Sequence, residues 1–462
     1  MKRHCGGKLR PKRVHIHTLG CPKNVVDSET FAGILRGAGY EYVSQPHRAD
    51  VLVINTCGFI DDAKVESIEM MLEGIRWKEQ KSERQVFAMG CLTQRDGQEV
   101  RDEIPELDGV FGIGEWGNML AEMGGNPLTI EAEEHAATQF AGKAGPGSAY
   151  LRISDGCSHA CAFCAIPQMR GLYRSERMED LVRDARILAQ EGVKELILIG
   201  QETTSYGVDL YRERKLVELC ERLSDVEGIH WLRLMYAHPP STPPHLMEQL
   251  ARVPKFAPYV DFPIEHASDN VLKLMNRRTS AARMKETIAA FRSARPDACI
   301  RTTALVGFPG ETDEDFAKLY RFMEDVRFER AGVFVYSPQE GTAGAVLPNR
   351  VEEGIALERL DRLMTLQRRI CNEKHRSLVG SSMEVIIDRT ARGVSWGRSA
   401  WDAPDIDGRV RIAGECEPGA MVTVRINKSS AYQLDAEPIS MRLHNARGEV
   451  CGKRLLPVLS QS

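Results

Sequence analysis

In Cys157-Ser158-His159-Ala160-Cys161-Ala162-Phe163-Cys164, three cysteines lie within eight residues at C-x3-C-x2-C spacing. Iron–sulfur clusters are held by cysteine thiolates, usually four of them. Three thiolates in one loop would therefore hold a 4Fe-4S cluster and leave one iron without a protein ligand. Because a metal ion with an open position can bind a reacting molecule, the spacing predicts a reactive centre rather than a structural one.

A zinc site is the alternative interpretation of these cysteines. Zinc takes four nitrogen or sulfur ligands, and structural zinc sites often use C-x2-C pairs. His159 would have to supply the fourth ligand from inside the loop, where its ring geometry would be strained. The spacing therefore favours an iron–sulfur cluster. It resembles the motif of the radical S-adenosylmethionine (SAM) superfamily, which implies that the open iron chelates the amino and carboxylate groups of SAM.

Length and composition indicate a soluble protein of several domains. The 462 residues predict about three domains, and 42% hydrophobic with 27% charged residues is typical of globular chains. The net charge of −4 provides no general attraction for nucleic acid. No apolar run approaches the roughly 20 residues of a membrane helix, and the basic residues 1–13 lack the apolar segment of a secretory signal. We expect a cytoplasmic protein whose twelve cysteines form no disulfides.

Three more cysteines each follow a strand-like segment, and helix-like segments at 28–35 and 64–77 lie between them. The segments and their cysteines are residues 14–20 with Cys21, 51–56 with Cys57 and 86–90 with Cys91. Alternating strands and helices predict a parallel sheet, whose ligands bind at the carboxyl ends of the strands. The three cysteines would converge there as a second three-thiolate site. The alternative is that they are ordinary buried cysteines, since free Cys is among the most buried residue types.

Two sets of three cysteines in this order resemble the methylthiotransferases. The segments that resemble the RimO branch of that family are Leu19-Gly20-Cys21-Pro22-Lys23-Asn24-Val25-Val26-Asp27-Ser28-Glu29 and Cys164-Ala165-Ile166-Pro167-Gln168-Met169-Arg170-Gly171. The resemblance extends from about Val14 to Gly452. It implies two 4Fe-4S clusters, one on Cys21, Cys57 and Cys91 and the other on Cys157, Cys161 and Cys164.

Between the cysteine loop and the C-terminal module, strand-like and helix-like segments alternate. The strand candidates are residues 150–154, 195–199, 231–236, 259–264, 300–306 and 332–336, and helix-like segments such as 178–190 and 281–292 lie between them. Six such units are too few for a closed eight-stranded barrel. We predict a partial, open (βα)6 barrel, the core that radical SAM enzymes share, whose openness would admit a macromolecular substrate.

The resemblance places the SAM contacts at the ends of the second and fifth barrel strands and at the residue before the third cysteine of the loop. The residues expected to bind SAM are Phe163, Gly200, Gln201, Glu202, Gly307 and Phe308. Glycine lets the backbone approach a ligand closely, although a glycine in a loop more often only turns the chain. A lone phenylalanine likewise more often belongs to the core. The family usually has glutamine where Glu265 stands, and an acid there would alter the electrostatics near the cluster.

The C-terminal part predicts a small antiparallel β-barrel of the OB-like kind. Its five strand-like runs are residues 383–390, 394–399, 409–413, 421–428 and 432–438. The module resembles the TRAM domain, which often binds RNA through a basic face. Here residues 381–452 hold nine Arg and Lys against ten Asp and Glu. The acidic loop at 402–407 is therefore expected to bind a basic protein, such as a ribosomal protein.

The predicted organisation is α/β and multidomain. Its parts are a basic flexible tail at 1–13, an N-terminal α/β domain at 14–140, the radical SAM barrel at 148–378, the TRAM domain at 379–452 and a tail at 453–462. The resemblance implies transfer of a methylthio group to the β-carbon of an aspartate on the small-subunit ribosomal protein of the decoding centre. A 5'-deoxyadenosyl radical from SAM would remove the hydrogen, and a second SAM would methylate a sulfide held at the N-terminal cluster.

No catalytic acid or base is expected, because a carbon radical replaces acid–base chemistry. The expected partners are the ribosomal protein, a one-electron reductant of flavodoxin or ferredoxin type and the ribosome, with the enzyme a monomer that binds no membrane. One alternative is a MiaB-type tRNA methylthiotransferase, weakly favoured by the basic residues 2–13 and disfavoured by the acidic C-terminal module. Another is a non-catalytic iron–sulfur redox sensor that docks on ribosomes and lacks SAM-binding loops.

Overall fold

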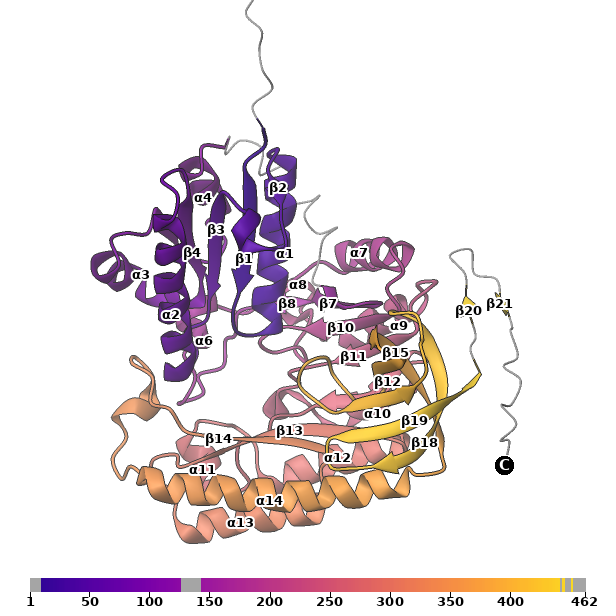
Figure 1. Ribbon diagram of the computed structural model, residues 1–462. Helices are drawn as coiled ribbons and strands as arrows, with labels where there is room; N and C mark the ends of the chain where they lie inside the picture. Colours follow the sequence, from indigo (N-terminus) through magenta and orange to yellow (C-terminus); the bar gives the residue numbers. More distant parts are fainter. Residues whose placement is uncertain (1–9, 126–142, 441–442, 445–449, 452–462) are drawn as a thin grey trace, which may run out of the picture. The chain divides into compact units, whose positions relative to one another are not determined.

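The computed structural model describes residues 10–125, 143–440, 443–444 and 450–451 (Figure 1). The chain forms two compact units. The N-terminal unit comprises Met1–Gly142 with Cys164–Leu172, and the C-terminal unit comprises Lys143–Phe163 with Tyr173–Ser462. The predicted tail at 453–462 and most of that at 1–13 lie outside the described residues.

The N-terminal unit is built on a five-stranded parallel sheet with the order β2-β1-β3-β4-β5. The strands are β1 (Arg13–Thr18), β2 (Glu41–Tyr42), β3 (Val51–Thr56), β4 (Gln85–Gly90) and β5 (Gly109–Phe111). The helices are α1 (Pro22–Gly37), α2 (Asp61–Glu79), α3 (Cys91–Glu103) and α4 (Trp116–Glu122). All six residues of β3 are buried, as expected of a central strand covered on both faces. The predicted parallel sheet is confirmed.

Alternate residues of β3 point to opposite sides of this sheet. Val51 and Val53 belong to one apolar cluster, which includes Phe31 of α1. Leu52 and Ile54 belong to another, which includes Met71 of α2. The period-two alternation of a strand therefore gives each face its own core, and helices cover both faces.

The C-terminal unit contains a seven-stranded open sheet with the order β14-β13-β12-β11-β10-β7-β6 (Figure 1). The strands are β6 (Lys143–Gly145), β7 (Ser148–Arg152), β10 (Glu195–Ile199), β11 (Trp231–Leu234), β12 (Phe256–Asp261), β13 (Cys299–Val306) and β14 (Arg330–Val335). Six of them are parallel and confirm the open six-unit barrel. Strand β6 pairs antiparallel to β7 and was not predicted.

Helices between the parallel strands pack on this sheet. The principal helices are α7 (Met178–Gln190), α9 (Leu216–Ser224), α10 (Pro244–Arg252), α12 (Ala281–Ala294), α13 (Asp313–Val326) and α14 (Glu353–Ser377). Shorter elements are β8 (Ser154–Asp155), α6 (Ile166–Arg170), β9 (Arg174–Ser175), α8 (Val208–Tyr211) and α11 (Asp269–Leu274). Apolar residues three and four apart, such as Leu181, Ala185 and Leu188 of α7, form the stripe that enters the core.

Five strands near the C-terminus close into a barrel with the order β15-β16-β17-β19-β18. They are β15 (Ser382–Ala391), β16 (Val394–Ser399), β17 (Arg409–Ala413), β18 (Met421–Ser429) and β19 (Gln433–Ser440). The predicted small barrel is confirmed. One pair, β17 with β19, is parallel, whereas the prediction was wholly antiparallel. A barrel with an odd number of strands cannot close with every pair antiparallel.

The acidic loop at 402–407 is a correction to the sequence analysis. Asp402 Oδ1 accepts a hydrogen bond from Arg330 Nη2 of β14 at 2.6 Å. Asp407 Oδ2 accepts one from the Tyr259 hydroxyl of β12 at 2.8 Å. Both carboxylates therefore anchor the closed barrel to the open sheet within the C-terminal unit. The prediction that this loop binds a basic partner is wrong for these two residues, although Asp405 is exposed.

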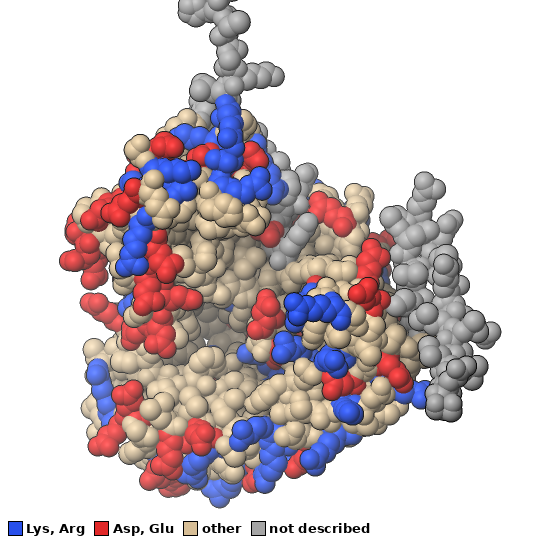
Figure 2. All heavy atoms as spheres, viewed as in Figure 1, with Lys and Arg blue, Asp and Glu red and all other residues tan. Residues whose placement is uncertain are grey.

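Charge is mixed on the molecular surface along α13 and α14, where Lys and Arg alternate with Asp and Glu in small groups (Figure 2). Oppositely charged side chains of the two helices form ion pairs there, for example Arg369 of α14 with Glu324 of α13 at 3.0 Å. Among the described residues, no helix combines the length and the apolar character that crossing a membrane requires.

Candidate active site

The N-terminal cysteines lie where neighbouring parallel strands end. Cys21 follows β1 and caps α1, Cys57 follows β3, and Cys91 follows β4 and begins α3. Strands β1, β3 and β4 are adjacent in the sheet, so the three thiols share one edge. A Cβ at Gly20, directly before Cys21, would lie 2.9 Å from Cys57 Sγ. Cys91 Sγ lies 3.5 Å from Oδ1 of Asn24, in the first turn of the helix that Cys21 caps. The structure thus brings the three residues together, and their role as metal ligands stays a proposal.

Two buried asparagines hold the cysteine-bearing turns. Asn24 Nδ2 donates to Leu19 O at 2.8 Å and to Thr56 O at 3.1 Å. Asn55 Nδ2 in turn donates to Asn24 O at 2.8 Å. These hydrogen bonds join the turn before α1 to the end of β3, and so they determine the relative positions of Cys21 and Cys57.

Gly20 allows a close approach between the turn before α1 and Cys57. Its φ of +85° is a conformation that side chains disfavour, and a Cβ there would lie 2.8 Å from Cys57 Cβ and 2.9 Å from Cys57 Sγ. Glycine is therefore required both by backbone conformation and by space.

Burial raises the pKa of three of these thiols, those of Cys57, Cys91 and Cys157. It raises the pKa of Cys91 to about 12, and Arg170 acts in the opposite direction. It raises the pKa of Cys157 to about 11. Cysteine ligands bind metals as thiolates, so loading either set must release protons. In the parts of the chain that the structure describes, no three His, Cys, Asp or Glu side chains are arranged to share one metal ion.

The cysteine loop at 157–164 divides between the two units, because the chain passes from the C-terminal to the N-terminal unit after Phe163. In the C-terminal unit, Cys157 is buried and Cys161 is partly exposed. Cys161 Sγ lies 3.9 Å from His238 Nε2 and 3.9 Å from Arg277 Nη1. Cys164 begins the segment that belongs to the N-terminal unit.

His159, the fourth ligand required by the zinc interpretation, is engaged elsewhere. Its ring stacks on that of His238 with 4.0 Å between centroids. Its Nε2 atom lies 3.2 Å from Ser241 Oγ and 3.9 Å from Glu202 Oε2. These contacts give His159 a structural role in the loop and weaken the zinc alternative.

Gln201 has the environment that a ligand-binding residue requires. Its amide Oε1 and Nε2 are both buried, and among the described residues neither has a hydrogen-bond partner. An unpaired buried amide is costly, and a bound molecule with a donor and an acceptor would satisfy it. The amino and carboxylate groups of SAM offer both, so Gln201 fits the predicted cofactor.

The neighbours of Gln201 serve the loop itself. The Glu202 carboxylate is buried and accepts hydrogen bonds from the backbone N–H of Thr204 at 2.6 Å and of Ser205 at 3.0 Å. Gly200 lies against Ser154, whose Oγ would be 2.3 Å from a Cβ at that position. Glu202 and Gly200 therefore shape the loop in which Gln201 lies.

Phe163 and Phe308 meet in one apolar cluster, which also contains Ala162, Val271 and Met275. Phe308 is fully buried and packs edge-on against Tyr336, with 4.9 Å between ring centroids. Gly307 has a φ of +77°, and a Cβ there would lie 2.7 Å from Ala356 Cβ. The structure places the two phenylalanines in one cluster, and their contacts with SAM stay predictions.

Glu265, the departure from the family pattern, reaches the cysteine loop through Arg277. Its carboxylate lies 3.6 Å from Arg277 Nη2, and Arg277 Nη1 faces Cys161. Burial raises the pKa of Glu265, and Arg277 opposes that effect. Sequence reasoning assigned no role to Arg277 or to His238, because both lie more than 70 positions after the loop that they contact.

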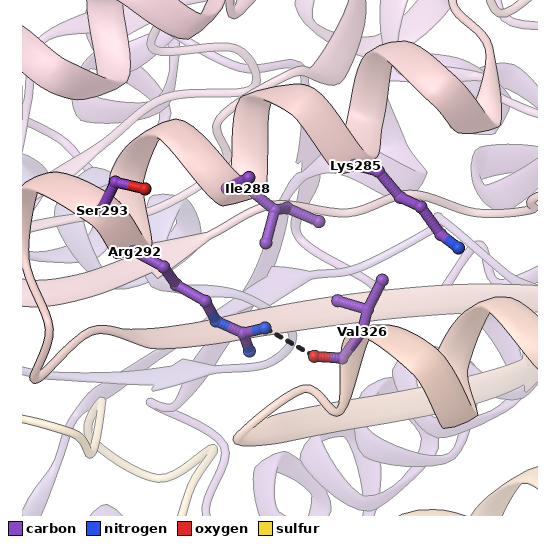
Figure 3. Close-up of a pocket in the computed structure, with 6 residues that line it drawn as sticks. Lys285, Ile288, Arg292, Ser293 and Val326 are labelled. Carbon is purple, nitrogen blue, oxygen red and sulfur yellow. Dashed lines mark hydrogen bonds between the residues drawn. The ribbon is translucent and has the colours of Figure 1, made fainter.

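A surface pocket between α12 and the end of α13 contains none of the predicted site residues (Figure 3). Arg292 Nη1 donates to Val326 O at 2.5 Å, and its Nη2 donates to Arg327 O at 3.0 Å. These bonds satisfy carbonyls at the C-terminal end of α13. The arginine that lines the pocket is therefore engaged in capping the end of α13.

Three family models match successive parts of the chain: the Uncharacterized protein family UPF0004 at residues 13–112, the Radical SAM superfamily at 151–323 and the TRAM domain at 379–439. Ribosomal protein uS12 methylthiotransferase RimO of Thermoanaerobacter sp. (strain X514) is 41% identical in an alignment 442 residues long, which covers 92% of this chain and 100% of that protein. The RimO protein of Anaeromyxobacter sp. (strain Fw109-5) is 41% identical over 94% of this chain and 95% of its own. The chain belongs to the RimO family of methylthiotransferases.

Membership of the RimO family makes this chain a radical SAM enzyme, which uses SAM and a 4Fe-4S cluster. The radical SAM methyltransferase TsrM from Kitasatospora setae, solved with cobalamin and a 4Fe-4S cluster bound, aligns with a TM-score of 0.54. That alignment covers 84% of this chain and 81% of TsrM at 13% identity, so it concerns the fold alone. The predicted family is confirmed.

Proposed function

We propose that this RimO-family enzyme transfers a methylthio group to the β-carbon of an aspartate on ribosomal protein uS12. The relatives support this substrate, since they are named uS12 methylthiotransferases. The observation that carries the chemistry is the gathering of Cys21, Cys57 and Cys91 at one sheet edge, separate in sequence from the loop at 157–164. One three-cysteine site suffices to generate a radical, and a second supports storage of the sulfur that is transferred.

The six cysteines would hold two 4Fe-4S clusters, each with one iron free of protein ligands. When bound, the loop cluster supplies the electron that cleaves SAM to a 5'-deoxyadenosyl radical, and the N-terminal cluster supplies the sulfur. The protein contributes binding, orientation and exclusion of water. Gln201 would orient the methionine part of SAM through its buried amide. Phe163 and Phe308 would pack against the adenine.

The proposed partners follow from this chemistry. Each cleavage of SAM consumes one electron, so an external reductant of flavodoxin or ferredoxin type is required. The substrate is a ribosomal protein, so contact with the ribosome is part of the proposal. The open sheet of the C-terminal unit supports access for a macromolecule. We further propose that the enzyme acts as a monomer in the cytoplasm.

The test is mass spectrometry of uS12 from cells that lack this chain and from cells that carry it back. We expect the methylthio mass on uS12 to disappear in the deletion and to return with the intact chain. A Cys57→Ala chain should not restore it.

Modified nucleosides of tRNA from the same cells provide the internal comparison. A loss confined to methylthio-adenosine would contradict the proposal and indicate a tRNA enzyme. Unchanged uS12 and tRNA, together with no SAM binding by the purified chain, would indicate a redox sensor instead.

A further inference from the structure

The short helix α6 carries a buried arginine into the N-terminal cysteine site. It follows Cys164 directly and belongs to the N-terminal unit. Ala165 and Met169 are almost completely buried and form an apolar cluster with Cys91. The last residue of α6 is Arg170, whose side chain is 1% exposed. Packing of α6 therefore fixes the arginine relative to the thiol of Cys91.

The guanidinium of Arg170 contacts three groups of this site with one nitrogen. Arg170 Nη2 lies 2.7 Å from Asp27 Oδ2, 2.8 Å from Asn24 Oδ1 and 3.5 Å from Cys91 Sγ. Asn24 is the residue that joins the turns carrying Cys21 and Cys57. Arg170 thus contacts one cysteine directly and the framework of the other two through Asn24.

A buried arginine stays charged, and its burial is costly unless anions accompany it. Asp27 supplies one negative charge in the chain as it stands. Metal binding would convert the thiols of Cys21, Cys57 and Cys91 to thiolates and add more negative charge at the same place. Hydrogen bonds to cluster sulfurs and nearby charge are among the factors that set the reduction potential of an iron–sulfur cluster.

We propose that Arg170 is a positioning residue of the N-terminal cluster: it donates an N–H···S hydrogen bond to the Cys91 thiolate and makes that cluster easier to reduce. The inference rests on the proposed second cluster. A positive charge beside the cluster stabilises its reduced, more negative form, so the midpoint potential rises. An Arg170 that only paired with Asp27 would stabilise the fold and leave the potential unchanged.

The test uses the full chain with Cys157, Cys161 and Cys164 all changed to Ala, so that only the N-terminal cluster is loaded. Redox titration followed by electron paramagnetic resonance measures the ratio of reduced to oxidised cluster. At a fixed solution potential near the midpoint, Arg170→Met should lower this ratio by about three- to tenfold, the range expected for one lost hydrogen bond. Arg170→Lys keeps the charge without the planar fork and should recover part of the loss.

Arg84→Met is the matched control. Arg84 is also a buried arginine of the N-terminal unit, but its guanidinium stacks on Trp77 at 4.2 Å and donates to Trp77 O at 2.7 Å. It should destabilise the fold without changing the ratio. Asp27→Asn provides a test of sign, because it removes the counter-charge and should raise the ratio.

If Arg170→Met fails to fold, the test uses Arg170→Lys and Asp27→Asn instead. The first should lower the ratio of reduced to oxidised cluster and the second should raise it. An unchanged ratio in a fully loaded Arg170→Met chain would overturn the inference. If the parent chain with the loop cysteines removed binds no iron at all, the proposed second cluster is what fails, and the two failures are thereby distinguished.

Discussion

The two sets of three cysteines are built in opposite ways. Cys157, Cys161 and Cys164 lie within eight residues, and their proximity is a property of one loop. Cys21, Cys57 and Cys91 lie in three separate strand–helix turns, and only the order of β1, β3 and β4 in the sheet brings them together. The first set can be recognised from spacing, whereas the second requires the topology of a parallel sheet.

Their surroundings differ as well. In the N-terminal set, Cys57 and Cys91 are buried and Cys21 is partly exposed, whereas in the loop set only Cys157 is buried and Cys161 and Cys164 are partly exposed. A site at which SAM must enter and products must leave in every turnover needs access. A site that stores sulfur benefits from a rigid, buried framework such as the hydrogen bonds of Asn24 and Asn55. The contrast agrees with the proposed division of labour between the two sets.

The largest predicted effect separates the two sets directly. Cys161→Ala should abolish both reductive cleavage of SAM and methylthio transfer, because the loop loses a cluster ligand. Cys91→Ala should abolish methylthio transfer while SAM cleavage persists, since the loop is intact. Quantifying 5'-deoxyadenosine and methylthiolated uS12 peptide in the same anaerobic assay checks both. Cys220→Ala, at a buried cysteine in the core of the C-terminal unit, is the control and should retain both activities.

A second prediction concerns the C-terminal unit, which contains Cys157 and Cys161 but not Cys164. Fully buried Glu195 accepts hydrogen bonds from Arg233 Nε at 2.7 Å and from Arg398 Nη1 at 2.8 Å. Glu195→Gln removes the carboxylate that the two buried arginines share, and among the described residues only Arg398 keeps another, Asp388 at 3.1 Å. The change should lower the free energy of unfolding by about 3 kcal/mol at pH 7. Hydrogen exchange should show the loosening in the C-terminal unit and leave the N-terminal sheet unchanged.

The effect of Glu195 depends on pH. Burial opposes its ionisation, but Arg398 and Arg233 outweigh burial and lower the pKa from 4.5 to about 2. A depressed folded-state pKa means that the contribution is complete above about pH 4.5 and is lost as the pH falls towards 2. Denaturant titrations of the apo-proteins should show the difference between wild type and Glu195→Gln shrinking across that window. A difference that stays constant from pH 7 to 3 would contradict this assignment.

A third prediction tests the buried framework of the N-terminal set. Gly20 and Gly39 share a φ of +85°, but a Cβ at Gly39 would have nothing within 4 Å, whereas one at Gly20 would press on Cys57. Gly20→Ala and Gly39→Ala should therefore share the cost of backbone strain, about 1 kcal/mol. Only Gly20→Ala should also reduce iron bound by the N-terminal set. Equal iron contents in the two variants would show that the close approach at Cys57 does not matter.

The smallest predicted effect belongs to SAM binding. Gln201→Leu removes an amide that is buried without a partner among the described residues, and it should weaken SAM binding by about two- to tenfold. Isothermal titration on the reconstituted enzyme measures this change. The N-terminal iron content should stay the same. The control is Gln98→Leu, at a surface residue that donates a hydrogen bond to Asp102. If Gln98→Leu weakened SAM binding as much as Gln201→Leu does, the evidence for a contact between Gln201 and SAM would be lost.

The sequence predicted the sheets well because alternation and apolar runs are local signals. The strand at Val394–Ser399 and the helix at Met178–Gln190 were located to the residue. Strand β6 was missed, since three residues are too few for a pattern. The acidic loop at 402–407 was misread because charged residues in a loop are usually solvated, and only the folded chain places Arg330 and Tyr259 against it.

In the candidate site, too, local signals could be predicted from the sequence and long-range contacts could not. The six cysteines proposed as cluster ligands were identified from spacing and strand ends, which are visible in sequence. Arg170, His238 and Arg277 were not, because no local signal shows that α6 packs on Cys91 or that two distant residues reach Cys161. Arg170 lies in a segment that was used only as a family signature. Contacts between elements far apart in the chain are what sequence reasoning could not supply.

The measurement that tests the central claim most directly is iron and sulfide analysis with Mössbauer spectroscopy on three anaerobically reconstituted chains. We predict about eight irons in the intact chain and about four in each chain that has one cysteine set changed to Ala. About four irons in the intact chain, with no loss when Cys21, Cys57 and Cys91 are removed, would contradict the account of two separate clusters.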